Sequence, residues 1–185
     1  SFMSKLLKKR MLIVDASSFL YRAYHALPDL RSKKGHPTGA LHGIVNMLKK
    51  VRVDWPSQIG ACVFDPKGPT FRDKIYPDYK ATRSSMPEDL KLQISPIFDV
   101  VKALGWPFIQ VNGFEADDVI GTLVCEASKK NFKSVIISGD KDLAQLVNEH
   151  VILVDTMSRH GGTGKVYDIP AVSEKFGVLP EKIVD

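Results

Sequence analysis

The stretch MLIVD, residues Met11–Asp15, decides the fold class, because four apolar residues in a row end there in a carboxylate. A continuous apolar run of this length is typical of a strand that is buried on both faces of a sheet. Three further runs have the same character: IGACVFD at 59–65, PFIQV at 107–111, and SVIIS at 134–138, the last followed by Gly139 and Asp140. The repetition predicts at least four buried strands.

Segments with helical periodicity separate these runs. Apolar residues share one helical face at 41–51, after Thr38 as the expected N-cap, at 87–104 and at 115–130. Pro96 is expected to kink or divide the second of these helices. The alternation of strand and helix predicts an α/β fold, with a mostly parallel twisted sheet and helices on both faces.

The pattern is weaker after Leu143, where we expect a short helix to Val147, strands at 151–154 and 166–167, and a helix from Pro170. Residues 1–10 are interpreted as an N-terminal extension, in which Ser1 and Phe2 precede Met3 as a cloning remnant would. Residues 11–185 are interpreted as one α/β core.

The composition argues against several classes of protein. A chain of 185 residues with 44% hydrophobic residues suits one globular domain rather than a disordered or fibrous protein. It contains no run of 18 apolar residues and no signal-peptide pattern, so a cytoplasmic protein is expected. Cys62 and Cys125 each lie in an apolar run, which predicts two buried thiols rather than a disulfide or a metal site.

The net charge of +5 conceals an asymmetry along the chain. Residues 1–110 hold 18 Lys and Arg against 9 Asp and Glu, whereas residues 111–185 hold 8 against 12. A basic surface beside an acidic cluster suits a metal-dependent enzyme that acts on a polyanion. Ordinary solvated faces produce such asymmetry equally well, so the charges alone do not decide the function.

Carboxylates follow all four predicted strands. The set consists of Asp15, Asp65, Glu115, Asp117, Asp118, Asp140 and Asp142. Parallel sheets bind ligands outside the carboxyl ends of their strands, where these groups would meet. Two carboxylates 4 Å apart repel by about 1 kcal/mol in water and about 4 kcal/mol at an effective dielectric constant of 20. Mg²⁺ or Mn²⁺ would compensate that repulsion, and two such ions could flank a phosphate and supply a bound water as nucleophile.

A structural interpretation of each acid stands beside this one. An Asp at a strand end is a common turn former or helix cap, and acids at 115–118 would stabilise a helix N-terminus in any protein. Glu115 and Asp118 share a helical face, while Asp117 points about 100° away, so the three are expected to divide between metal, water and cap. Acids at four strand ends together favour the metal site.

Five segments, in order, resemble a known family. They are IVDASSFLYRAYHAL (13–27), PTGALHGIVNML (37–48), VFDPKGPTFRDKIYPDYKATR (63–83), GFEADDVIGTL (113–123) and SGDKDLAQLV (138–147). They closely resemble the 5′ nuclease, or 5′→3′ exonuclease, domain at the N-terminus of bacterial DNA polymerase I, which is related to phage exonucleases and flap endonucleases. The resemblance implies a PIN-like nuclease that cleaves DNA at 5′ ends and flaps and removes RNA primers and damaged strands in replication and repair.

The resemblance also implies roles for the acids and for the partners. Asp15, Asp65, Glu115 and Asp117 would belong to a first-metal group with Asp118 nearby, and Asp140 and Asp142 to a second-metal group, for Mg²⁺ or Mn²⁺. The implied partners are DNA with 5′ ends or flaps, RNA primer–DNA hybrids, and a polymerase domain in the same parent chain, in the bacterial cytoplasm at the nucleoid. The family continues into further aspartates and a helix-hairpin-helix type motif, which these 185 residues do not reach. Weak or no activity is therefore expected of this segment alone.

Residues 67–83 interleave basic and aromatic side chains. They include Lys67, Phe71, Arg72, Lys74, Tyr76, Tyr79, Lys80 and Arg83. Such a segment suits a single strand, whose bases stack on rings and whose phosphates meet cations, although a solvated loop has the same composition. By resemblance, Tyr79, Lys80 and Arg83 hold the flap and the scissile phosphate, with Arg72 nearby on the DNA.

Two other basic positions are assigned less narrowly. By resemblance, Arg22 is a further phosphate contact, where its charge could stabilise developing negative charge. For the loop with Arg31, Lys33 and Lys34, a DNA-backbone role and a plain surface role are equally open. Two alternatives to the nuclease remain: a catalytically silent DNA-binding or scaffold module, and a small-molecule phosphoesterase, which would not explain residues 67–83.

Overall fold

The computed structural model describes residues 9–26, 29–66, 86–157 and 164–183, and within them six strands form one sheet. The strands are β1 (Arg10–Asp15), β2 (Ile59–Phe64), β3 (Phe108–Gln110), β4 (Lys133–Ile137), β5 (Val151–Asp155) and β6 (Lys165–Tyr167). Their order across the sheet is β3-β2-β1-β4-β5-β6; the first five are parallel and β6 runs antiparallel to β5. The predicted α/β fold with a mostly parallel sheet is confirmed.

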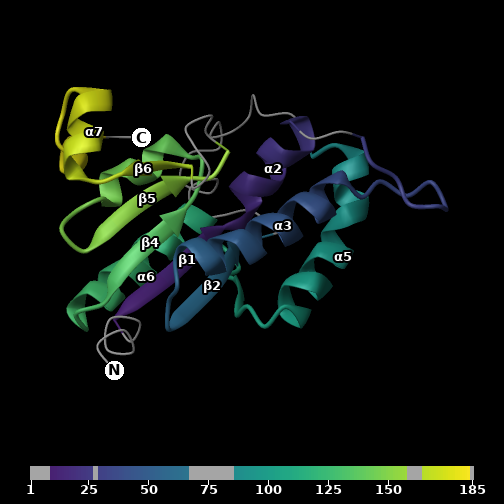
Figure 1. Ribbon diagram of the computed structural model, residues 1–185, viewed down its shortest axis with the longest axis horizontal. Helices are drawn as coiled ribbons and strands as arrows, with labels where there is room; N and C mark the ends of the chain where they lie inside the picture. Colours follow the sequence, from purple (N-terminus) through teal and green to yellow (C-terminus); the bar gives the residue numbers. More distant parts are fainter. Residues whose placement is uncertain (1–8, 27–28, 67–85, 158–163, 184–185) are drawn as a thin grey trace.

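The helices connect these strands (Figure 1). They are α2 (Ala16–Ala26), α3 (Gly39–Asp54), α5 (Glu88–Ala103), α6 (Ala116–Lys129) and α7 (Ile169–Phe176), with short 3₁₀ helices η1 (Lys141–Leu146) and η2 (Pro180–Lys182). Helix α2 was not predicted from the sequence; it begins directly after Asp15 and buries Phe19, Leu20 and Ala23. Pro96 does not divide α5, because it lies on the exposed side, where water can satisfy the carbonyl group that loses its partner.

Alternate residues of each strand enter two separate cores. Leu12 and Val14 of β1 pack with α2, α3 and α5, whereas Met11 and Ile13 pack with α6 on the other face. Figure 1 shows α2, α3 and α5 together, with α7 beyond the β6 edge at the opposite end. Because both faces are covered, the strands consist of continuous apolar runs.

The chain changes direction across the sheet between β1 and β4. From β1 it proceeds to β2 and β3 on one side, and then to β4 and β5 on the other. Such a switch point opens a crevice at the carboxyl ends of the two central strands, because their connections leave in opposite directions. Asp15 stands at the end of β1 and Ser138 directly follows β4, so both lie at this point.

The prediction of two buried thiols is half wrong. Cys62 is buried in β2, and burial raises the pKa of its thiol to about 12. Cys125 is exposed, because it lies on the face of α6 that turns away from the sheet. In the described part of the chain, no helix is long and apolar enough to cross a membrane.

Candidate metal centre

Asp15 lies at the centre of the predicted acidic site and is only 4% exposed. Its carboxylate accepts hydrogen bonds from Ser138 Oγ at 2.7 Å and from Ser18 N at 3.5 Å, which are both neutral groups. Burial is the main cause that raises the pKa of Asp15 to about 7; the charges of Asp65 and Asp140 act in the same direction, and the hydrogen bonds from Ser138 and Ser18 act against it. Negative charge here is therefore poorly compensated by the protein itself.

The turn after β4 brings Asp140 beside Asp15. The Ser138 hydroxyl that donates to Asp15 also accepts from the backbone N of Asp140 at 3.0 Å. Asp140 is the N-cap of η1, and its Oδ1 accepts from the backbone N of Asp142 at 3.0 Å. One carboxylate oxygen of Asp140 therefore caps a helix, as the structural interpretation of these acids predicted. The side chain of Asp142 is exposed one residue into η1.

Asp65 connects the end of β2 to the start of α6. Its Oδ1 accepts from the backbone N of Ala116 at 2.7 Å, which is the first N–H group of that helix. The Ser17 hydroxyl accepts from the Asp65 backbone N at 2.9 Å and so ties the same residue to α2. These two hydrogen bonds hold Asp65 between Asp15 and the acids of α6.

Glu115, Asp117 and Asp118 form the tightest acidic group in the described part of the chain, with one carboxylate oxygen from each within 4.8 Å of the others. Asp117 and Asp118 are successive residues of α6 and therefore lie about 100° apart around the helix, yet one oxygen of each is within 4.8 Å of one oxygen of Glu115. The side chain of Glu115 makes no capping hydrogen bond; Asp65 Oδ1 accepts from the N–H of Ala116, and Asp117 Oδ1 accepts from the N–H of Asp118 at 3.0 Å.

The structure thus gathers six of the seven predicted acids in two linked parts, and the seventh, Asp142, has an exposed side chain in η1. Asp15 and Asp140 lie at the switch point, and Asp65 bridges Asp15 to the group of Glu115, Asp117 and Asp118. The oxygen-only donor set, in which the carboxyl groups of Asp15 and Glu115 are buried and the others are more accessible, fits a hard divalent cation that keeps several water ligands.

The predicted residues of the basic, aromatic segment are not part of this geometry. Arg72, Tyr79, Lys80 and Arg83 lie within residues 67–85, outside the described residues. Their assigned roles remain predictions.

Arg22 lies in an ion-pair group that the sequence analysis missed. Its Nη1 is 2.8 Å from Asp155 Oδ1, and Lys141 Nζ is 2.8 Å from Asp155 Oδ2. The Asp155 side chain is 6% exposed, against 38% for Arg22 and 30% for Lys141. Burial by itself raises the pKa of Asp155, but the hydrogen bonds and charges of Lys141 and Arg22 outweigh burial and lower it.

The sequence carried a signal for Asp155. VILVD at 151–155 repeats the pattern of MLIVD at 11–15, an apolar run closed by an acid. Unlike Asp15, this acid is neutralised by two cations of the protein. The same sequence pattern therefore yields two acids of opposite electrostatic character.

Gly139 allows Arg22 to reach Asp155. A Cβ atom at position 139 would overlap the guanidinium group of Arg22, which lies directly over this glycine. Since Gly139 stands between Ser138 and Asp140, the arginine passes beside the acidic site.

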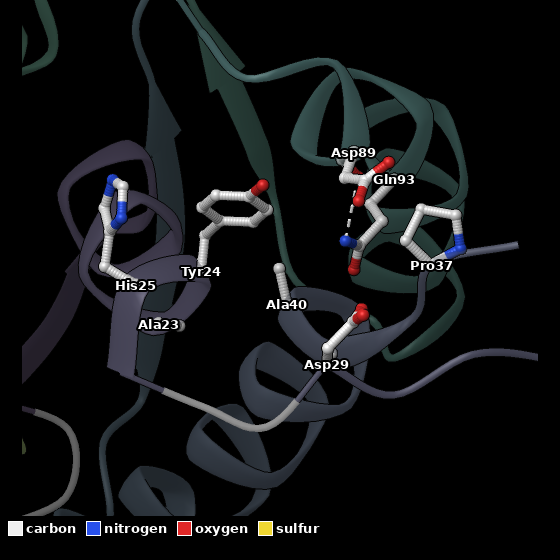
Figure 2. Close-up of a pocket in the computed structure, with 9 residues that line it drawn as sticks. Ala23, Tyr24, His25, Asp29, Pro37, Ala40, Asp89 and Gln93 are labelled. Atoms are coloured by element: carbon white, nitrogen blue, oxygen red, sulfur yellow. Dashed lines mark hydrogen bonds between the residues drawn. The ribbon is translucent and has the colours of Figure 1, made fainter.

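The loop at 29–37 has a structural role for one of its cations. Arg31 donates to Asp89 at 2.9 Å, to Asp29 at 3.4 Å and to the carbonyl of Gly35 at 3.2 Å. A pocket beside this loop is lined by residues of α2, α3 and α5, and Figure 2 shows Gln93 donating to the Asp89 carbonyl there. None of the seven predicted acids lines the pocket, so it is separate from the acidic site.

Comparison with known proteins agrees with the resemblance. Residues 10–177 match the family described as 5′-3′ exonuclease, N-terminal resolvase-like domain. DNA polymerase I of Pseudomonas aeruginosa is 51% identical over 175 residues, which are 95% of this chain and 19% of that protein. The 5′-3′ exonuclease of Aquifex aeolicus is 43% identical over 177 residues, which are 96% of this chain and 60% of that protein.

A solved structure shares the fold. It is a bacteriophage T5 flap endonuclease in a pseudo-enzyme-product complex with DNA and metal ions, with a TM-score of 0.67 and 18% identity. The match covers 91% of this chain and 61% of that one, and it confirms the PIN-like fold. The chain thus spans less than two thirds of the length of these relatives. Because the family match includes almost all of the described residues, the chain belongs to the family of 5′-3′ exonuclease N-terminal, resolvase-like domains.

Proposed function

We propose that this domain is a metal-dependent 5′ nuclease that hydrolyses phosphodiesters of DNA at 5′ ends and 5′ flaps. The observation that carries the proposal is the approach of Asp65 and Asp140, from two other strand ends, to a buried Asp15 whose pKa is raised to about 7. A structural acid is normally neutralised, as Asp155 is here. Asp15 instead accepts hydrogen bonds from neutral groups, as expected of a carboxylate that serves as a ligand for a cation.

In this proposal the acids hold Mg²⁺ or Mn²⁺, with two ions in the intact site. Asp15, Asp65 and the group of Glu115, Asp117 and Asp118 would surround one ion, and Asp140 and Asp142 would serve the second. Bound divalent ions would lower the pKa of a coordinated water and stabilise the charge that develops on the phosphoryl oxygens. Ser138 would keep Asp15 oriented through its hydroxyl, and Asp65 would hold α6 so that its acids face the same space.

The substrates and the setting belong to the same proposal. A flap endonuclease of this fold has been seen with DNA and metal ions, and one relative is a DNA polymerase I. We infer that the chain removes 5′ flaps and RNA primers in replication and repair, next to a polymerase domain and at the bacterial nucleoid. Arg22, Tyr79, Lys80 and Arg83 are the proposed contacts to the reacting phosphate and the flap.

The test is cleavage of a labelled 5′-flap duplex with Mn²⁺, before and after addition of EDTA. Residues 1–185 and a natural chain that continues beyond Asp185 are compared, because the 1–185 segment is expected to cleave weakly or not at all. Asp117→Asn and Asp140→Asn in the longer chain are expected to lower the cleavage rate by at least about 100-fold, the scale of losing one electrostatic stabiliser.

A matched control is Glu126→Gln, which removes an exposed acid of α6 that pairs with Lys129 at 3.0 Å. It should leave the cleavage rate unchanged. If the longer chain binds the flap duplex but leaves it intact in Mn²⁺, the silent DNA-binding module replaces the nuclease.

A further inference from the structure

Three lysines surround the ring of Tyr167 on the edge strand β6. Their Nζ atoms lie 4.7 Å (Lys141), 5.4 Å (Lys175) and 5.9 Å (Lys165) from the ring centroid. Lys175 also lies 3.1 Å from the Tyr167 hydroxyl, to which it donates. The lysines come from three different elements, η1, β6 and α7, so the fold itself brings these charges together.

The lysine group is short of negative charge. Among the described residues, Lys141 is the member of this group that forms an ion pair. Its partner is Asp155, which also pairs with Arg22. Two lysines therefore add positive charge that no described carboxylate neutralises, in a half of the chain that is net acidic. Like charges repel when they are held close together, and a bound anion would remove that repulsion.

The lysine group adjoins the acidic site. Lys141 stands between Asp140 and Asp142, and Lys165 pairs in register with Asp155 at the carboxyl end of β5. In Figure 1, β6 and α7 lie at the end of the sheet opposite α5. Because a nucleic-acid backbone carries phosphates in succession, one strand can present a phosphate to the acidic site and another to the lysine group.

We propose that Lys141, Lys165 and Lys175, arranged around Tyr167, form a contact surface for the phosphate backbone of DNA on the β6–α7 side of the acidic site. This inference rests on the proposed function and deepens it, because it states along which side of the site the DNA runs. The Tyr167 ring holds the lysines in place: its faces attract the ammonium groups, and its hydroxyl accepts from Lys175. The surface reads charge and not sequence, because it offers ammonium groups alone.

The test measures binding of a fluorescent 5′-flap duplex by anisotropy at several salt concentrations. It uses the natural chain that contains residues 1–185, with EDTA to prevent hydrolysis. The double variant Lys165→Gln/Lys175→Gln is expected to bind several-fold more weakly. The slope of log K against log salt is negative, and its magnitude should decrease by about 1 to 2, since each lost phosphate contact removes about 0.9 from that magnitude.

The matched control is Lys49→Gln/Lys130→Gln, which removes two exposed lysines near the C-terminal ends of α3 and α6, where the chain leads into the amino ends of β2 and β4 and not to the carboxyl ends at which the acids lie. It should leave the salt slope unchanged. An equal fall of the slope in both double variants would overturn the proposed surface, because the effect would then reflect net charge. An unchanged slope in the Lys165/Lys175 variant would overturn it as well. If the unaltered chain failed to bind the duplex at all, the proposed function itself would fail.

Discussion

The side chain of Asp15 combines near-complete burial with two neighbouring carboxylates, Asp65 and Asp140. Both conditions disfavour its ionised form, and its pKa is accordingly raised from 3.8 to about 7. Between these two values the folded protein holds a proton that the unfolded chain has released. The free energy of unfolding therefore falls as the pH rises through this window. Above pH 7 the folded protein bears the whole free-energy cost of holding Asp15 ionised.

Asp15→Asn should stabilise the metal-free protein at pH 8. The amide cannot ionise, so the variant avoids a cost of up to about 4 kcal/mol, at about 1.4 kcal/mol per unit of pKa. Urea unfolding in EDTA measures the gain, which should be smaller at pH 5 and vanish near pH 4. Asp99→Asn, at an exposed position of α5, serves as control and should change stability by less than about 0.5 kcal/mol at either pH. A destabilised Asp15→Asn protein at pH 8 would contradict the raised pKa.

The buried carboxylate of Asp155 has the opposite character, because Arg22 and Lys141 each bind one of its oxygens at 2.8 Å. Asp155→Asn leaves two cations facing a neutral amide. We expect a loss of about 2 kcal/mol in the free energy of unfolding, less than for a fully buried pair because both cations are partly exposed. Denaturant unfolding at pH 7 measures it.

The control for this loss is the same substitution in a helical surface pair. Asp54→Asn breaks the ion pair with Lys50, at 3.0 Å and four residues apart on α3. Such pairs contribute about 0.3 to 0.5 kcal/mol. Equal losses in the two variants would show that Asp155 is no more than a surface acid.

At the scale of elements, the turn between β4 and η1 depends on the absence of a side chain. Arg22 crosses from α2 to Asp155 over Gly139, where a Cβ would overlap its guanidinium group. A second close approach occurs at Gly164, which has φ +84° and whose Cβ would overlap the carbonyl oxygen of Asp155. Both glycines thus lie against the ion-pair group, and they allow β5, β6 and α2 to meet there.

Gly139→Ala should destabilise the protein by about 1 to 3 kcal/mol, because the arginine must move or lose its partner. Gly121→Ala provides the comparison: this glycine lies inside α6, and its added Cβ would meet Leu146 at an ordinary 3.8 Å. The helical substitution should stabilise by about 0.5 to 1 kcal/mol. Thermal unfolding of both variants measures these changes in stability. A stabilised Gly139→Ala protein would rule out the close packing of Arg22 over Gly139.

At the scale of the whole molecule, the sheet order β3-β2-β1-β4-β5-β6 brings together acids that are distant in sequence. Asp15, Asp65 and Asp140 interact although 50 and 125 residues separate the latter two from the first. A cation bound among them would connect β1, β2 and the starts of α6 and η1. Its effect should therefore appear in the stability of the entire domain.

Mn²⁺ should raise the melting temperature at pH 7.5, and EDTA should reverse the shift. At a concentration 100 times the dissociation constant, the stabilisation amounts to about 2.7 kcal/mol. Asp117→Asn should reduce the shift, while Glu126→Gln, on the exposed face of α6, should preserve it. An equal shift in both variants would place the bound ion elsewhere.

The class of the fold and the identity of the acids followed from local patterns. A strand that is buried on both faces is apolar along its length, so an acid that follows an apolar run marks the end of the strand. MLIVD and the similar runs therefore predicted both the buried strands and the acids that follow them. The helix α2 was missed because it has no separate apolar stripe preceded by a loop; it continues directly from Asp15. Cys125 was misplaced because an apolar run in a helix still has an outer face.

What local patterns could not settle is which acid lacks a counter-charge. Asp15 and Asp155 close nearly identical strands, yet one faces Ser138 and other carboxylates and the other faces Arg22 and Lys141. Electrostatic interactions depend on distances in space, and those distances are set by the order of the strands and by the crossing of Arg22 over Gly139. The sequence specifies the residue types, but the sign of the charge around each carboxylate is determined only when distant segments pack together.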